Sequence, residues 1–202
     1  MARLLRVWLG CAVLALGAVP AAALEAQPLP WESKVCAMVT AAAEPAMGIP
    51  SQLMAAIARA ESGRWDAARH ASFAWPWTVT AEGQGHYYAT KAQAVEAVRK
   101  LHARHITNID VGCMQVNLHY HPRAFPSIEA ALDPMKNAIY AGQFLKSLYE
   151  QQGSWTKAAE RYHSPEFHAR NHYVVKIGHL WFDEYRRAEG AATPAEAPAA
   201  AD

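Results

Sequence analysis

The most informative stretch of the chain lies at residues 50–63 and reads PSQLMAAIARAESG. Its apolar residues recur at helical spacing, as in Leu53 and Ile57, which predicts an amphipathic helix. Pro50 suits the first turn of a helix, and Gly63 suits a helix end because glycine tolerates the left-handed conformation found there. We therefore expect a helix that begins at Pro50 and ends near Gly63, with its apolar face against a core.

Glu61 continues the apolar face of this predicted helix, four residues beyond Ile57. A carboxyl on that face is partly removed from water, and in the last helical turn the helix dipole also disfavours its negative charge. Both effects favour the protonated form, which a general acid requires. The alternative is an ordinary glutamate at a helix boundary whose carboxylate reaches into water.

A second segment, GCMQVN at residues 112–117, predicts a tight turn that carries polar amides beside an apolar thioether. Amide groups bind the hydroxyl and acetamido groups of sugars, so Gln115 and Asn117 are candidate sugar ligands. The side chain of Met114 is expected to pack against the face of a sugar ring. The segment therefore predicts a carbohydrate subsite.

Three segments in this order, PSQLMAAIARAESG (50–63), GCMQVN (112–117) and AAERYHS (158–164), resemble the motifs of the soluble lytic transglycosylase domain family. The family pattern is a helix ending in Glu-Ser, a Gly-Leu-Met-Gln turn and an Ala-Tyr-Asn element. The resemblance covers roughly residues 35–185, and three ordered motifs are far more specific than any one of them. It implies a lysozyme-like α+β domain, mainly α, that acts on the glycan strands of peptidoglycan.

The resemblance also implies roles for individual residues. Glu61 is the expected catalytic acid/base, with Ser62 beside it as a supporting hydrogen-bonding residue at the substrate. Met114 and Gln115 are expected to line the sugar subsites. Tyr162 is expected to donate a hydrogen bond near Glu61, orienting the carboxyl or the substrate.

The chain departs from the family pattern at two positions and in one segment. Cys113 stands where the family has leucine, and His163 stands where it has asparagine, so a family contact at position 163 is not carried over. The segment between Glu61 and Gly112 is longer than in compact members. We expect its insert, residues 72–109, to form one wall of the substrate cleft; the alternative is plain packing.

Elsewhere the pattern predicts further helices and one small β-hairpin. Alternating apolar residues after position 72, followed by glycines at 83 and 85, predict a hairpin within residues 72–90. Helical spacing predicts helices at 32–47, 91–105, 127–132, 134–151, 154–162 and 168–187, with a short extended or turning segment at 106–118. The expected organisation is a lead-in segment at 24–34, one domain at 35–187, and a disordered Ala/Pro-rich tail at 188–202.

Residues 1–23 have the layout of a secretory signal peptide. Two arginines near the start are followed by an apolar run that ends at Val19, and small residues then suit cleavage after Ala23. This predicts a periplasmic or secreted protein with no membrane segment after cleavage. The alternatives are an uncleaved membrane anchor and lipid attachment at Cys11.

Charge and composition exclude some classes of partner. The chain has 19 basic and 18 acidic side chains, so loss of the two signal arginines leaves 17 against 18, a balance unlike that of nucleic-acid-binding proteins. Seven Trp and eight Tyr suit a carbohydrate ligand. His119 and His121, and likewise His168 and His172, have ligand spacing, but no HExxH motif occurs, so we expect neither a metal nor an organic cofactor.

Cysteine usage agrees with export. Removal of the signal peptide leaves Cys36 and Cys113, and an even pair in an oxidising compartment predicts a disulfide. Such a bond would close a long loop. By restricting the unfolded chain it would raise the free energy of unfolding by ~4 kcal/mol. The alternative is two buried free thiols.

The resemblance implies a reaction with one carboxylate. Glu61 protonates the β-1,4 bond between N-acetylmuramic acid and N-acetylglucosamine and then, as a base, takes the C6 hydroxyl proton so that a 1,6-anhydro end forms. A hydrolase on the same scaffold, lysozyme-like or acting on chitin, needs a second carboxylate, and the candidates are Asp66 and Asp110. A third interpretation is a non-catalytic peptidoglycan-binding accessory protein of a secretion or conjugation complex in the cell envelope.

Overall fold

The fold was analysed in a computed structural model that describes residues 30–163 and 167–192. The helices are α1 (Glu32–Met47), α2 (Leu53–Ser62), α3 (Lys91–Ala103), α4 (Ile128–Ala131), α5 (Pro134–Gln152), α6 (Trp155–His163) and α7 (Phe167–Ala192). The strands are β1 (Gly63–Asp66), β2 (Ala71–Ala74), β3 (Thr78–Ala81), β4 (Gln84–Tyr87), β5 (Ile109–Val111) and β6 (Val116–Asn117). The predicted signal peptide and lead-in residues 24–29 lie outside the described residues.

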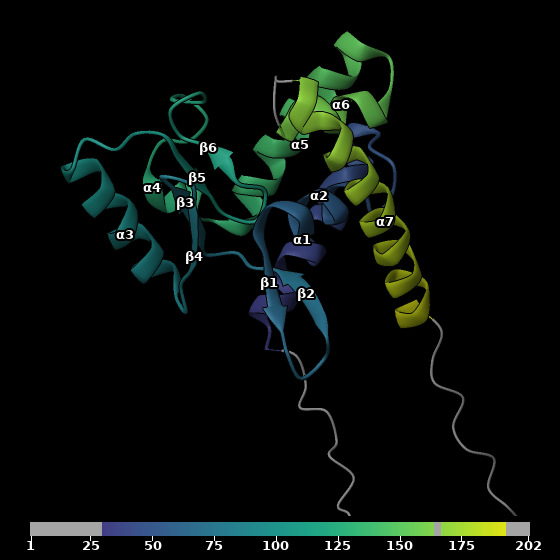
Figure 1. The fold of residues 1–202 in the computed structure, drawn as a ribbon, viewed down its shortest axis with the longest axis horizontal. Helices are drawn as coiled ribbons and strands as arrows, with labels where there is room; N and C mark the ends of the chain where they lie inside the picture. The colour runs from purple at the N-terminus through teal and green to yellow at the C-terminus, as the bar shows by residue number, and fades with distance from the viewer. Residues whose placement is uncertain (1–29, 164–166, 193–202) are drawn as a thin grey trace, which may run out of the picture.

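Two lobes lie side by side, one helical and one built on a sheet (Figure 1). The helical lobe contains α1, α2, α5, α6 and α7, and the β1–β2 hairpin projects from it. The sheet lobe contains α3 and α4 with an antiparallel sheet in the order β4-β3-β5-β6. This arrangement confirms the predicted lysozyme-like α+β architecture, mainly α.

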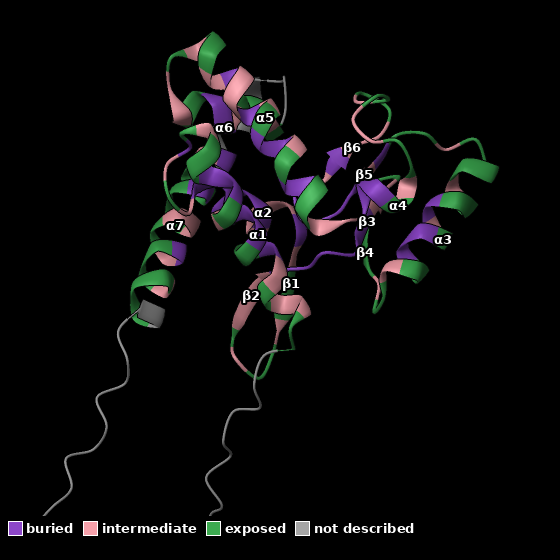
Figure 2. Ribbon diagram, turned by 180° about the vertical axis from the view of Figure 1, so that it is seen from behind, coloured by how far each residue is buried: buried purple, intermediate pink, exposed green. Residues whose placement is uncertain are grey.

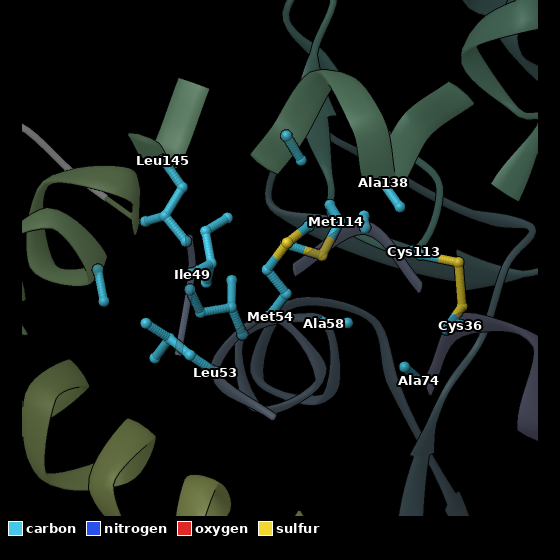
Figure 3. Packing of buried hydrophobic residues seen from close by; sticks show 14 of the residues in the cluster. Cys36, Ile49, Leu53, Met54, Ala58, Ala74, Cys113, Met114, Ala138 and Leu145 are labelled. Atoms are coloured by element: carbon cyan, nitrogen blue, oxygen red, sulfur yellow. A yellow bond between two sulfur atoms is a disulfide. The ribbon is translucent and has the colours of Figure 1, made fainter. Parts of the chain in front are cut away.

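The core of the helical lobe surrounds α2. Leu53, Met54 and Ile57 are fully buried there, and the burial follows the helix from its first to its last turn (Figure 2). Met54 packs in the same cluster as Met114, close to the disulfide between Cys36 and Cys113 (Figure 3). The predicted disulfide is therefore present, and it links α1 to the turn between β5 and β6.

The sheet lobe has a core of its own. Val79 and Val111 are paired across β3 and β5, and both are buried against Val98 of α3. Trp75 and Trp77 also belong to this core, and their rings meet edge to face at a centroid distance of 6.4 Å. The insert therefore contributes to an apolar core that is separate from the core of the helical lobe.

The β structure is more extensive than the single predicted hairpin. The hairpin β3–β4 is present, and its two turn residues, Glu82 and Gly83, both have the positive φ that a tight two-residue turn requires. The expected strand through Phe73 and Val79 is instead divided between β2 and β3, since Pro76 lies between them and donates no backbone hydrogen bond. The predicted extended segment at 106–118 supplies β5 and β6.

Most predicted helices are present with ends shifted by a few residues, but two boundaries were wrong. The helix α2 begins at Leu53 and not at Pro50, because Gln52 adopts a left-handed conformation with φ 65°. The tail was expected to begin at position 188, yet α7 continues to Ala192. The extra residues are mainly alanine and glutamate, which favour helix, and residues 193–202 lie outside the described part.

Among the described residues, the helices are too short or too polar to cross a lipid bilayer.

Candidate active site

Helix α2 carries Glu61 at its C-terminal end. Its first turn is capped by a side chain from α1, because the buried Glu44 carboxylate accepts hydrogen bonds from the backbone N–H groups of Gln52 at 2.8 Å and Met54 at 2.7 Å. Burial raises the pKa of Glu44, and the backbone hydrogen bonds oppose that rise. The position of Glu61 therefore depends on a carboxylate one helix earlier in the chain.

The end of α2 is shaped by a close backbone approach at Gly63. This residue has φ −65° and ψ 115°, so it is extended and not left-handed as predicted. Glycine is needed for another reason, since a Cβ at this position would lie 2.3 Å from the carbonyl oxygen of Arg59. The chain can therefore pass directly from α2 into β1 without an intervening loop.

Glu61 lines a cleft of about 770 Å³ between the two lobes. Its side chain is 15% exposed, so the carboxyl is largely shielded but reachable from the cleft. The remaining lining comes from the sheet, from the β6–α4 connection and from α5 and α6, and consists of Thr80, Asp110, Gln115, Val116, Asn117, Tyr120, His121, Phe144, Leu148, Arg161, Tyr162 and His163. From the insert, residues 72–109, this lining includes Thr80, and the rest of its sheet side comes from residues 110–117.

Asp110 is a second carboxylate in the same cleft. Its Oδ1 accepts a hydrogen bond from the Asn117 side-chain amide at 2.8 Å. Burial raises the pKa of Asp110 and the nearby Glu61 raises it further, while the Asn117 hydrogen bond and His163 lower it. The two carboxyls are therefore close enough to affect each other electrostatically.

The 112–117 turn is held against the end of α2 by buried hydrogen bonds. The Ser62 hydroxyl, which is fully buried, lies 2.7 Å from the carbonyl oxygen of Cys113 and 2.9 Å from that of Ala58. On the other side, the buried Asn137 side chain accepts a hydrogen bond from the Met114 N–H at 2.9 Å. These contacts connect the first two motif segments through the backbone.

The third motif segment reaches the same turn from α6. The Tyr162 hydroxyl was expected to donate a hydrogen bond near Glu61, and it donates to the carbonyl oxygen of Met114 at 2.8 Å. Burial raises the pKa of this hydroxyl well above its usual range, and the charges of Glu61 and Asp110 raise it further, so it remains a donor. The adjacent His163 places Nδ1 3.1 Å from Oε1 of Glu61.

Over residues 38–173, about two thirds of the chain, the sequence matches the family described as Transglycosylase SLT domain. The chain belongs to this family. Members act on peptidoglycan, and the three motif segments of the SLT domain converge on the cleft that contains Glu61. Comparisons with curated proteins and with solved structures find no match.

Two residues that we expected to touch substrate are buried in this SLT domain. Met114 is fully buried in the helical core, where its thioether packs beside Met54 (Figure 3). Ser62 is also fully buried, and its hydroxyl bonds to the protein backbone. Both predictions of substrate contact are therefore wrong, because the close packing of α2 against the turn takes these side chains inward.

Gln115 and Asn117 do line the cleft of the SLT domain, but their amides bond to the protein. The Gln115 amide accepts from the Thr80 hydroxyl at 2.6 Å and donates to the carbonyl oxygens of Thr78 and Gly112. The Asn117 amide donates to Asp110 and accepts from two backbone N–H groups of the turn that follows it. These hydrogen bonds hold the sheet side of the cleft in its shape.

Several residues of the site were missed by sequence reasoning. Tyr120, which is 71% exposed, lies at the cleft, and Tyr173 of α7 lies buried beside Glu61. Burial raises the pKa of Tyr173 well above its usual range, and the Glu61 charge adds to the rise, although no hydrogen bond of acceptable geometry joins the two groups. Asn137 was also missed, since a lone asparagine in a helix gives no local signal of burial.

The remaining candidates lie away from the reaction centre or form other contacts. Asp66 accepts a hydrogen bond from its neighbour Arg69 at 2.7 Å and does not line the Glu61 cleft. Nδ1 of His121 lies 2.9 Å from the Tyr140 hydroxyl, and Nδ1 of His119 lies 3.2 Å from the Thr107 hydroxyl. Among the residues whose side chains the structure describes, no three ligating side chains gather as a metal site would require, and His168 and His172 lie outside this set.

Proposed function

We propose that this protein is a peptidoglycan lytic transglycosylase in which Glu61 is the only acid/base. The observation that supports this most directly is a largely shielded carboxyl on the wall of a cleft of about 770 Å³. Export to the periplasm or beyond, which the predicted signal peptide supports, would bring the enzyme to its glycan substrate.

In the proposed reaction Glu61 first donates its proton to the oxygen of the β-1,4 bond between N-acetylmuramic acid and N-acetylglucosamine. The C1–O bond breaks, and the acetamido group of the substrate stabilises the positive centre at C1. The Glu61 carboxylate then takes the proton of the muramic C6 hydroxyl, and O6 bonds to C1 to give a 1,6-anhydro end. Water is not consumed, and the carboxyl ends the cycle protonated as it began.

The protein around Glu61 would act mainly by holding it in place. Ser62 and Tyr162 both bond to the backbone of the 112–117 turn, so α2, the turn and α6 form one rigid frame around the carboxyl. Rigid placement matters because a displacement of about 1 Å between reacting groups can cost on the order of 100-fold in rate.

A second candidate function is hydrolysis, which the presence of Asp110 in the cleft favours. A carboxylate there could position a water molecule or stabilise the positive centre, as the second carboxylate of a glycosidase does. Against this, one oxygen of Asp110 already accepts a hydrogen bond from Asn117, and burial raises the pKa of the group, which favours its uncharged form.

Mass spectrometry of fragments released from purified sacculi separates these functions. A hydrolytic product is heavier than the anhydro product by one water. We expect anhydro ends from the wild type and from Asp110→Asn, and loss of turnover by at least about 10²–10⁴-fold in Glu61→Gln, because both its acid and base roles are lost. Asp66→Asn serves as a matched control, since this carboxyl lies outside the cleft and should leave the rate unchanged.

The outcomes are distinct. Products heavier by one water, lost in Asp110→Asn, would establish the hydrolase. Substantial turnover by a folded Glu61→Gln variant would reject the assigned acid/base. Binding of wild-type protein to sacculi without release of any fragment would favour the non-catalytic accessory protein.

A further inference from the structure

His163 lies against the carboxyl of Glu61 although the two residues are 102 positions apart in the chain. Its Nδ1 is 3.1 Å from Oε1 of Glu61, and its side chain is 39% exposed. The imidazole also lies flat on the ring of Tyr173 from α7, with ring centroids 4.1 Å apart and planes inclined by 5°. It is thus in contact with both the carboxyl and the helix behind it.

We infer that His163 is a positioning residue, which holds one oxygen of Glu61 so that the other faces the glycosidic bond. This inference rests on the proposed role of Glu61. It concerns the residue at which the chain departs from the asparagine of the family pattern.

The chemistry of the contact follows from the number of oxygens on a carboxyl group. A glutamate side chain has three rotatable bonds. Without a contact that fixes the carboxyl, rotation about these bonds would let its two oxygens exchange positions in the cleft. With the ring proton on Nδ1, His163 donates to Oε1 whether Glu61 is protonated or ionised. Oε2 is then the atom that gives its proton to the glycosidic oxygen and later takes the C6 hydroxyl proton.

The stack on Tyr173 keeps the imidazole in the plane that this hydrogen bond needs. Tyr173 is 5% exposed, so its ring is a fixed surface. Its pKa is raised well above the usual range by burial and then by Glu61, so its hydroxyl stays protonated and adds no second negative charge beside the carboxylate. His163 is held on one side by packing and on the other by a hydrogen bond.

Two substitutions separate the hydrogen bond from the stack. His163→Phe keeps a flat ring over Tyr173 but places carbon where Nδ1 was. His163→Asn loses the ring but carries its amide nitrogen on Cγ, the atom that carries Nδ1 in histidine, so a donor remains at the same position. If His163 were only a surface histidine packed on Tyr173, the phenylalanine variant would behave as the wild type.

The test is steady-state kinetics on a soluble, uncrosslinked peptidoglycan glycan oligomer. We expect His163→Phe to lower kcat roughly 10- to 100-fold, the effect of losing one hydrogen bond to a charged group, with KM changed by less than about twofold. His163→Asn is expected to recover kcat to within about threefold of wild type. Thermal unfolding of each variant checks that the fold is intact.

Where His163→Phe unfolds, His163→Ala with free imidazole in solution replaces it, and the expected result is a recovery of kcat that rises with imidazole concentration. Wild-type kcat in a folded His163→Phe variant, or equal losses in the phenylalanine and asparagine variants, would overturn the positioning role. These results are distinguishable from failure of the proposed function, because Glu61→Gln measured in the same assay would then still be inactive.

Discussion

Gly112 allows the sharpest test of how the cleft is built. Its φ of +84° lies in the region that side chains with a Cβ rarely adopt, and an alanine there costs about 1–2 kcal/mol from the backbone alone. The Cβ would also lie 2.6 Å from Cγ and Nδ2 of Asn137, a distance at which the asparagine must move. Asn137 is fully buried in α5, so the surrounding protein leaves it little freedom to do so.

The cost of moving Asn137 can be worked out from its three hydrogen bonds. Its Oδ1 accepts from the Met114 N–H at 2.9 Å, and its Nδ2 donates to the carbonyl oxygens of Val111 at 3.0 Å and Ala131 at 3.1 Å. Each buried group left unpaired costs about 1–3 kcal/mol, so at a mid-range cost of about 2 kcal/mol the loss of one or two of them adds about 2–4 kcal/mol. Together with the backbone term, Gly112→Ala should lower the free energy of unfolding by about 3–6 kcal/mol and Tm by roughly 10–20 °C.

Thermal and denaturant unfolding measure this effect, and Gly83→Ala provides the control. Gly83 also has a positive φ, +76°, but a Cβ there would have no neighbour within 4 Å, so only the backbone cost of about 1–2 kcal/mol applies. In a double-mutant cycle, Gly112→Ala with Asn137→Ala should lose less than the sum of the two single losses, because the clash is gone. Equal losses for the two glycine variants, or strict additivity in the cycle, would refute the reasoning.

Two further predictions concern the disulfide and the second carboxylate. The bond between Cys36 and Cys113 spans 77 residues, so Cys36→Ser should lower the free energy of unfolding by about 4–5 kcal/mol in the chain-entropy model, and identical melting of oxidised and reduced wild type would contradict this. Burial raises the pKa of Asp110 above 3.8, so its native-state protonation stabilises the fold below that pH and the contribution is lost as pH rises through the raised value. Wild type should therefore lose stability relative to Asp110→Asn as pH rises above about 3.8, and denaturant unfolding at several pH values that gave the opposite trend would reject the raised pKa.

Local patterns predicted the helices well, since their signals lie within a few residues. The apolar face of α2 placed Glu61 on a buried surface, and its carboxyl is indeed largely shielded. Gly48 ends α1 in the left-handed conformation that a helix stop favours. The start of α2 was misjudged because its cap is Glu44, a residue from another helix.

Local sequence was enough to predict most of the helices, the β3–β4 hairpin, the family and the shielding of Glu61, because helical spacing, turn chemistry and ordered motifs are local properties of the chain. Tertiary structure alone decided what surrounds that carboxylate. Met114 lies in the core and not against a sugar, and Asp110 shares the cleft while Asp66 does not. Likewise His163 contacts Glu61 although 102 residues separate them in the chain. Such contacts depend on how α2, α6 and the sheet pack together, and no short stretch of sequence encodes this packing.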